Sequence, residues 1–255
     1  MKIGVSSDIK NAAAVKAAGY DYFETALSRI AELSEAEFES FRQQLAALQL
    51  PLEVVNGFFC AEPAIVGPDA NLPAVRAYAA RALDRARRLG VKIAVFGNGS
   101  KRRIPQGADP AEIYRQIDDV VRTLAEEGEK AGILIVVEHL RREEDNAYTT
   151  LQSVLDLVRR LNLPNVKALV DFYHLEMVDE SLEVVRRSGD LIAHAHVACH
   201  NDRHCPREED RALLESWRET LDACGYTGRV TIEAWNKDFE NEIRAAVPVM
   251  NLFRK

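Results

Sequence analysis

The sequence predicts an α/β fold, and more specifically a closed (β/α)8 barrel. Eight short runs rich in Val and Ile recur along the chain, and stretches with helical periodicity lie between them. Continuous apolar strands that alternate with amphipathic helices indicate a parallel sheet covered by helices. At roughly thirty residues per unit, eight units fill a chain of 255 residues. We therefore expect a single barrel domain over residues 1–255.

Each expected strand is a short apolar run, and each expected helix places apolar residues three and four positions apart. The strands are expected at residues 2–7, 21–27, 50–58, 91–99, 132–140, 166–174, 191–199 and 229–235. The clearest helical periodicity covers residues 35–49, 72–90, 111–132 and 150–161. Helix ends are marked by glycines, which readily adopt the left-handed conformation that closes a helix. These are Gly19, Gly90, Gly132 and Gly225.

An open, doubly wound sheet would satisfy the same alternation of strands and helices. Such a sheet binds dinucleotides through a G-x-G-x-x-G turn after its first strand. The segment GVSSDIKNAA at residues 4–13 contains no such turn, and the GNGS at residues 97–100 is too short to be one. The sequence therefore favours the closed barrel.

Composition and charge narrow the classes of partner. The formal net charge is −7 and 47% of the residues are hydrophobic. This acidic balance does not favour binding to nucleic acid or to an anionic membrane. Residues 1–10 lack the apolar stretch of a signal peptide, and the four cysteines form no CxxC pair. We expect a cytoplasmic protein with reduced cysteines that binds a small molecule.

Polar residues stand where the expected strands end. In a (β/α)8 barrel these ends meet at one mouth, where the chemistry takes place. The strand-end residues are Glu24, Asn56, Asn98, Glu138, Asp171 with His174, His196 and Glu233. Taken alone, Glu24 or Asn98 is expected to be a strand-end group that is hydrogen-bonded to a loop. Four ionisable residues at the ends of the fifth to eighth strands indicate a shared site instead.

Glu138, Asp171, His196 and Glu233 are the candidate metal ligands. In a closed barrel their side chains point at a common volume, where the carboxylates would repel each other and shift each other's pKa values. A divalent cation relieves that repulsion. Three carboxylates and one imidazole suit Mn²⁺, Mg²⁺ or Co²⁺ best, with Zn²⁺ as a further candidate. His194 shares a face with His196 but lies deeper, and we expect it to be a core histidine.

These residues resemble the xylose-isomerase-like TIM barrels, especially the ketose 3-epimerase and hydroxypyruvate isomerase branch of the sugar isomerases and epimerases. The likeness covers essentially the whole chain and is strongest from residue 91 onward. It rests on EHLRREEDN at 138–146, DFYH at 171–174, HAHVACHNDRHCP at 194–206 and TIEAW at 231–235.

The resemblance implies a role for each matching residue. It assigns one divalent metal ion to the four candidate ligands, and it assigns substrate binding to His174, Arg203 and Glu144. Arg142 completes the Glu-x-Leu-x-Arg pattern that begins at Glu138. His139 departs from the pattern, because these relatives often have Pro there. His200 and His204 are additional imidazoles in the loop after the seventh strand.

The activity implied by the resemblance is a metal-dependent isomerase or epimerase that acts on a ketose or a related α-hydroxy carbonyl compound. Glu138 and Glu233 would be the catalytic acid and base, and the reaction would pass through an enediolate. Two bases on opposite faces would invert a stereocentre, whereas one base would interconvert aldose and ketose. The resemblance also implies a homodimer or a homotetramer. Hydroxypyruvate isomerase, an inosose-type dehydratase, a non-catalytic metal and sugar binder and an abasic-site endonuclease are the alternatives.

Two aromatic residues and one basic loop each have two interpretations. Trp235 and Phe58 would either form apolar walls against a sugar or simply pack. The loop GNGSKRRIPQG at 97–107 brings Lys101, Arg102 and Arg103 towards the mouth, and a solvated run of charge is the favoured interpretation. The other interpretation is a site for a substrate phosphate or carboxylate.

Overall fold

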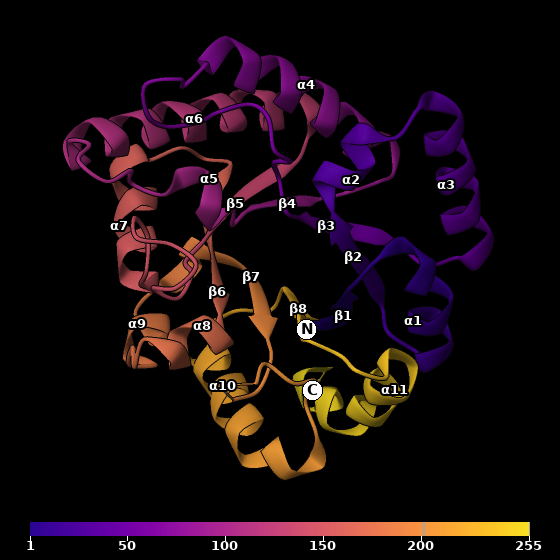
Figure 1. The fold of residues 1–255 in the computed structure, drawn as a ribbon. Coiled ribbons are helices and arrows are strands. Elements are labelled where there is room, and N and C mark those ends of the chain that lie inside the picture. Colours follow the sequence, from indigo (N-terminus) through magenta and orange to yellow (C-terminus); the bar gives the residue numbers. More distant parts are fainter. Residues whose placement is uncertain (201, 255) are drawn as a thin grey trace.

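The computed structural model describes residues 1–200 and 202–254, and in it eight parallel strands form a closed barrel (Figure 1). The predicted (β/α)8 fold is confirmed. The barrel closes because β1 pairs with both β2 and β8. In order, the strands are β1 (Lys2–Ser6), β2 (Tyr22–Ala26), β3 (Leu52–Asn56), β4 (Ile93–Phe96), β5 (Leu134–Glu138), β6 (Val166–Asp171), β7 (Ile192–Val197) and β8 (Arg229–Ile232).

Helices surround the barrel, as the view along its axis shows (Figure 1). The α-helices are α1 (Ala12–Ala18), α2 (Leu27–Glu32), α3 (Glu35–Leu48), α4 (Leu72–Arg88), α5 (Gly99–Arg102), α6 (Pro110–Ala131), α7 (Leu151–Leu161), α8 (Phe172–Met177), α9 (Glu183–Arg186), α10 (Arg211–Ala223) and α11 (Phe239–Met250). Four 3₁₀ turns complete the chain, η1 (Ile9–Asn11), η2 (Gly189–Leu191), η3 (Glu208–Asp210) and η4 (Asn251–Arg254).

The helix ends follow the local chemistry of the sequence. Gly19 and Gly132 close α1 and α6 in the left-handed conformation, as predicted. Gly90 and Gly225 also have positive φ, but each lies one residue beyond the residue that caps its helix. At the start of α3, Ser34 and Glu37 form a capping box, in which each side chain accepts from the other residue's backbone N–H.

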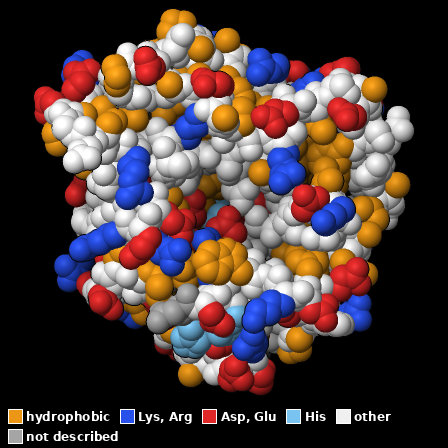
Figure 2. All heavy atoms as spheres, viewed as in Figure 1, with side chains coloured by type: hydrophobic (Ala, Val, Ile, Leu, Met, Phe, Trp, Pro, Cys, Tyr) orange, Lys and Arg blue, Asp and Glu red, His pale blue; other side chains and the backbone are white. Residues whose placement is uncertain are grey.

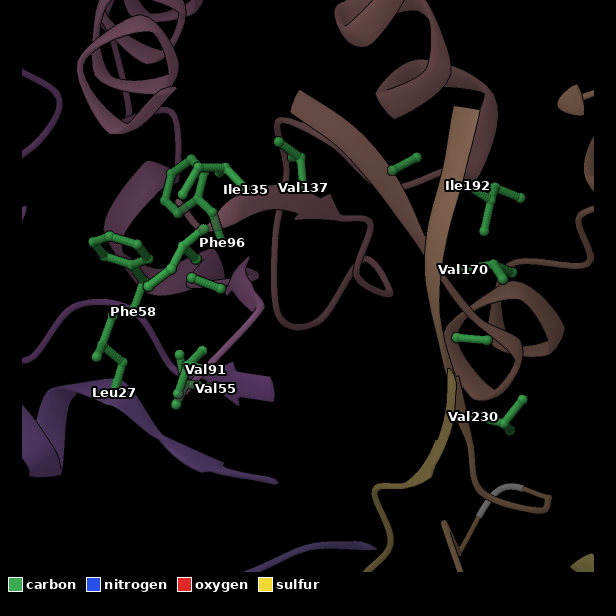
Figure 3. Packing of buried hydrophobic residues seen from close by; sticks show 14 of the residues in the cluster. Leu27, Val55, Phe58, Val91, Phe96, Ile135, Val137, Val170, Ile192 and Val230 are labelled. Atoms are coloured by element: carbon green, nitrogen blue, oxygen red, sulfur yellow. The ribbon is translucent and has the colours of Figure 1, made fainter. Parts of the chain in front are cut away.

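The apolar core has two parts. The larger part lies between the outward faces of the strands and the surrounding helices, and it includes Val170, Ile192 and Val230 (Figure 3). The smaller part fills the inside of the barrel with Tyr22, Val54, Ile93, Val95, Val136 and Leu169. Because side chains alternate between the two faces of a strand, the continuous apolar runs supply both parts at once. The barrel interior is therefore packed below the mouth.

A buried ion pair braces the loop after β4. Arg102 is completely buried and its Nε lies 2.6 Å from Asp145 Oδ2. The same guanidinium donates to the carbonyl oxygens of Phe96 and Glu138, at 3.1 and 2.6 Å. The interpretation of residues 101–103 as a solvated run of charge is wrong for Arg102, since its side chain ties the ends of β4 and β5 to the following loop.

The neighbouring cations also contact the protein. Lys101 Nζ donates to the carbonyl oxygens of Ala61 and Pro63, and Arg103 donates to the carbonyl oxygen of Glu143.

In the part of the chain that the structure describes, no helix combines the length and the apolar character needed to cross a lipid bilayer.

The buried pair of Arg102 and Asp145 is expected to contribute strongly to the stability of the fold. Arg102→Met should lower the free energy of unfolding by about 3 kcal/mol or more, because it leaves the Asp145 carboxylate buried without its counter-charge. Arg159→Met is the control, since Arg159 and Asp156 form a largely exposed pair, and should change that free energy by less than about 1 kcal/mol. Urea denaturation of both variants provides the measurement, and equal costs would contradict the bracing role.

Candidate functional site

A cavity of about 320 Å³ opens at the carboxyl ends of the strands. Figure 2 shows a hollow near the middle of this face, with acidic, basic and histidine side chains gathered beside a hydrophobic patch. The cavity is lined by Asn56, Gly57, Gly97, Glu138, Leu140, Glu144, His174, Arg203, Glu233, Ala234 and Trp235. Its position is the one that the strand-end residues predicted.

The four predicted metal ligands come together at this mouth. Glu138 ends β5, Asp171 ends β6, His196 is the fifth residue of β7 and Glu233 follows β8. One donor atom from each lies within 4.8 Å of the donors of the other three. The sheet register contributes directly, because Asp171 and His196 are paired residues of neighbouring strands. Three carboxylates and one imidazole in one small volume fit a hard divalent cation.

The His196 ring is held between carboxylates on its two sides. Nε2 lies 2.9 Å from Glu24 Oε1, while Nδ1 lies 3.2 Å from Glu138 Oε1 and 3.5 Å from a Glu233 oxygen. A carboxylate on the far nitrogen is the usual way in which a ligating histidine is oriented. Nδ1 is therefore the nitrogen that would bind a metal ion, with Nε2–H donated to Glu24.

Glu24 does not bond to a loop, and that expectation is wrong. Its side chain is completely buried and its Oε2 accepts from Thr231 Oγ1 at 2.7 Å and lies 3.0 Å from His194 Nε2. Glu24 lies two residues before the end of β2, so it is too deep in the barrel to reach the mouth. No sequence pattern signalled its pairing with two histidines from β7, because the three side chains meet only when the barrel closes.

The expectations for His194 and Asn98 are confirmed. His194 is a fully buried histidine below the mouth; its Nε2 lies 3.0 Å from Glu24 Oε2, while its buried Nδ1 has no hydrogen-bond partner among the described residues. Asn98 exchanges hydrogen bonds with the backbone of Phe59, accepting from its N–H and donating to its carbonyl oxygen, both at 3.1 Å. It supports the loop after β3.

The two glutamates at the mouth differ in protonation behaviour. Burial raises the pKa of Glu138 to about 7, and the negative charges of Glu233 and Asp171 act in the same direction. Burial also opposes ionisation of Glu233, but the positive charges of His196 and Arg203 outweigh it and hold the pKa of Glu233 at about 2. Near neutral pH the pair thus offers one carboxylate and one group close to its midpoint.

Asp171 and His196 show how strongly the charges interact. Burial raises the pKa of Asp171 above its usual range, against the opposing charge of Arg203. Burial would lower the pKa of His196, but Glu24 and Glu233 raise it well above the ordinary value. Such perturbation of buried groups in a cavity is typical of functional sites.

The three predicted substrate-binding residues all line the cavity. Arg203 Nη2 lies 2.5 Å from Glu233 Oε2 and 3.4 Å from Asp171 Oδ2, and its guanidinium stacks over the Tyr173 ring. Glu144 lies 3.9 Å from Arg203 Nη1. Arg203 is therefore held by carboxylates on several sides.

His174 has a defined tautomer. Its Nδ1 accepts from the backbone N–H of Arg141 at 3.2 Å, so the proton of the neutral ring is on Nε2. Burial, followed by the charge of Arg203, lowers the pKa of His174 to about 3. The ring is neutral at physiological pH, with an Nε2–H that lies on the side of Asp171.

Several residues of the site were missed. Arg142 is exposed, whereas the adjacent Arg141 donates to Glu144 and to the Tyr173 hydroxyl, both at 2.7 Å. Only the loop geometry decides which of two consecutive arginines faces inward. Asn56 was noted only as a strand-end residue, and it donates to Glu233 Oε1 at 2.8 Å.

Trp235, Phe58 and the remaining histidines lie in different environments. Trp235 lines the cavity and is 57% exposed, as a wall for a ligand requires. Phe58 is fully buried against Phe59 and Tyr78, so its role is packing. His139 is also buried, and its Nε2 accepts from the Asp171 backbone N–H at 3.3 Å. His200 and His204 lie together in the loop after β7.

Gly97 allows Glu138 to occupy its place at the mouth. A Cβ atom at residue 97 would overlap the Glu138 carboxylate, so only glycine fits against that side chain. This close approach explains why a glycine follows β4 directly.

We predict that Gly97→Ala will destabilise the protein by about 1–3 kcal/mol, because the added methyl group must displace the Glu138 side chain. The same substitution in a Glu138→Ala background should cost less, since the overlapping carboxylate is gone. A double-mutant cycle on the free energy of unfolding measures this coupling. Additive costs would show that Gly97 and Glu138 do not constrain each other.

Comparison with known proteins places the fold in a family. The chain matches the family described as xylose isomerase-like TIM barrel over residues 12–255. It is 27% identical to the 3-dehydro-D-guloside 4-epimerase of Escherichia coli and 31% identical to a putative hydroxypyruvate isomerase of Streptomyces coelicolor. These alignments cover 57% and 60% of this chain and 54% and 56% of the relatives, so the chain spans about half the length of these curated relatives.

Among solved structures, D-psicose 3-epimerase with D-tagatose from Clostridium cellulolyticum superposes with a TM-score of 0.80 at 22% identity, over 100% of this chain and 95% of the other. A likeness at that identity supports the fold. On the family match, which extends over most of its length, this chain belongs to the xylose isomerase-like TIM barrel family.

Proposed function

We propose that this chain is a divalent-metal-dependent sugar epimerase or isomerase that acts on a ketose or a related α-hydroxy carbonyl compound through an enediolate. The observation that carries the proposal is the convergence of Glu138, Asp171, His196 and Glu233, whose donor atoms lie within 4.8 Å of one another. Two of the four, Glu138 and Glu233, line the open cavity. The names of the relatives, which are epimerases and isomerases of small sugars and hydroxy acids, support the same class of reaction.

These four residues would hold the cation, with Mn²⁺, Mg²⁺ or Co²⁺ as the best match to three oxygens and one nitrogen. When bound, the cation would neutralise part of the gathered negative charge and stabilise charge that develops on the substrate's carbonyl oxygen. Glu24 fixes the imidazole of His196 from behind, and Asn56 fixes the carboxylate of Glu233.

Glu138 and Glu233 would exchange protons with the substrate. They come from β5 and from the end of β8, so they approach the cavity from different directions. The carboxyl groups of both residues line the cavity, so one would take a proton from a substrate carbon and the other would return one. A donor and an acceptor on two sides of one carbon favour epimerisation over transfer between neighbouring carbons.

His174, Arg203 and Glu144 would orient the substrate. The His174 Nε2–H and the Arg203 guanidinium are donors for hydroxyl or carbonyl oxygens, and both lie beside Asp171. Glu144 would accept from a hydroxyl group while it holds Arg141 in place. Trp235 offers an apolar face for the C–H side of a sugar ring or chain.

The cations of the loop after β4 support a neutral substrate. Lys101, Arg102 and Arg103 are each bonded to backbone carbonyl oxygens, and Arg102 also to Asp145. Arg203 in the cavity is paired with Glu233, and Arg141 is paired with the lining residue Glu144. Among the described residues that line the cavity, none is one of these three loop cations, and the lining Arg203 is already paired with carboxylates. A free ketose therefore fits better than a sugar phosphate or hydroxypyruvate, which would need a cation that is free to bind it.

We expect Glu138→Gln and Glu233→Gln each to lower turnover by about 10²-fold or more, because each removes one proton-transfer group. The assay is the incorporation of solvent deuterium into a panel of ketoses, hydroxypyruvate and inosose. Glu143→Gln is the matched control, since Glu143 is exposed in the loop that follows β5 and Glu138. Deuterium incorporation without dehydration supports the enediolate reaction. Dehydration of inosose would identify a dehydratase, and no exchange with any compound would leave a non-catalytic binding protein.

Metal binding is tested without turnover. Asp171→Asn and His196→Gln should each weaken Mn²⁺ binding by at least about tenfold, because each removes a ligand from a four-donor set. The electron paramagnetic resonance signal of free Mn²⁺ during titration measures the affinity. Asp190→Asn, an exposed acid on η2, should leave the affinity unchanged. Equal affinity in all three variants would refute the ligand assignment.

A further inference from the structure

A second cluster of metal-binding side chains lies in the loop after β7, apart from the four ligands at the mouth. Cys199, His204 and Asp210 each place a donor atom within 4.8 Å of the donors of the other two. All three residues are buried. His200, whose side chain is 59% exposed, brings its Nε2 to 3.1 Å from Asp210 Oδ1. None of these four residues has a part in the proposed sugar chemistry.

The backbone brings the cluster together. Cys199 and His204 form an isolated antiparallel bridge, in which Cys199 N–H donates to the His204 carbonyl at 2.9 Å and His204 N–H donates back at 3.1 Å. Asp210 arrives from η3, and its Oδ2 accepts from the Arg207 backbone N–H at 2.8 Å. These hydrogen bonds fix the segment, which thus places one thiol, two imidazoles and one carboxylate close together.

We propose that Cys199, His200, His204 and Asp210 bind a zinc ion. Sulfur, nitrogen and oxygen donors in this mixture suit tetrahedral zinc, whose bonds to them are about 2.0–2.3 Å long. Such bonds separate neighbouring ligand atoms by roughly 3.3–3.8 Å. His204 Nε2 lies 3.1 Å from Asp210 Oδ2, and His200 Nε2 lies 3.1 Å from Asp210 Oδ1. The exposed His200 side chain would turn to join the three donors that already lie together.

The surroundings of His204 support this assignment. Its Nδ1 lies 2.7 Å from Asp202 Oδ1, so that a carboxylate holds the nitrogen that points away from the cluster. This arrangement fixes the tautomer and directs the lone pair of Nε2 at the ion, as in zinc sites generally. His196 is oriented in the same way by Glu24.

Zinc binding would release the Cys199 thiol proton to solvent, so that one thiolate and one carboxylate balance the charge of the ion. The ion would then clamp the loop that carries Arg203. In the sequence, Arg203 lies between the two bridge residues Cys199 and His204. Its carbonyl oxygen accepts from the Trp235 N–H at 2.8 Å, and its guanidinium contacts Glu233. The proposed ion is structural, and its binding does not depend on the reaction at the mouth.

Cobalt substitution tests the proposal directly. Apoprotein titrated with Co²⁺ should develop the near-ultraviolet charge-transfer absorption of a thiolate bound to cobalt. The four ligands at the mouth contain no sulfur, so a cation bound there is silent in this band. We expect Cys199→Ser to lose the band and Cys205→Ser, a buried cysteine of the same loop, to keep it. A wild-type protein without the band, or a band that persists in Cys199→Ser, would overturn the proposal.

A substitution of an exposed ligand tests the site without disturbing the buried side chains. His200→Ala changes an exposed side chain and should weaken zinc binding at this cluster by at least about tenfold. Competition with a chromophoric chelator gives the affinity, and circular dichroism checks the fold. The Asp171→Asn variant is the reciprocal control, because it should weaken Mn²⁺ binding at the mouth and leave the cobalt–thiolate band intact. Unchanged zinc affinity in His200→Ala and in Cys199→Ser would refute the site.

Discussion

The structure is organised around the crowding of like charges at one end of a parallel barrel. Glu138, Asp171 and Glu233 are forced into a single small volume because the carboxyl ends of β5, β6 and β8 meet there. Buried carboxylates repel each other strongly in a medium of low polarity. The raised pKa of Glu138 reflects burial and this repulsion, whereas His196 and Arg203 offset the repulsion at Glu233 and lower its pKa. The same crowding of carboxylates explains the fit to a divalent cation.

The residues around the mouth hold that arrangement in place. Glu24 supports His196 from below, Asn56 supports Glu233 from β3, and Gly97 leaves space for Glu138. Arg102 and Asp145 secure the carbonyl end of β5 from outside. Groups that act on a substrate must be kept within a fraction of an ångström of their working positions, and a second layer of fixed partners is how proteins achieve this. The supporting residues come from different elements, so the site depends on the closed barrel.

Much of the architecture and part of the site could be predicted from sequence. The eight apolar runs became eight strands, because a strand buried on both faces has a continuous apolar sequence that short-range inspection detects. The strand-end residues from Glu138 to Glu233 were found for the same reason, since polar residues stand out after apolar runs. The favoured interpretation of Arg102 was wrong, and the two interpretations of Phe58 stayed open, because each side chain had two possible environments. Arg102 reads as a surface charge, and Phe58 as a possible wall, until the loops are placed.

The sequence alone determined the barrel and the four ionisable residues Glu138, Asp171, His196 and Glu233 at its mouth, because periodicity and strand ends are local properties of the chain. Tertiary structure decided which residues act together. The pairing of Glu24 with His194 and His196, the choice of Arg141 over Arg142, and the meeting of Cys199 with Asp210 all join residues from different elements or depend on the path of one loop. Such contacts exist only after closure of the barrel, and no local pattern encodes the distances between them.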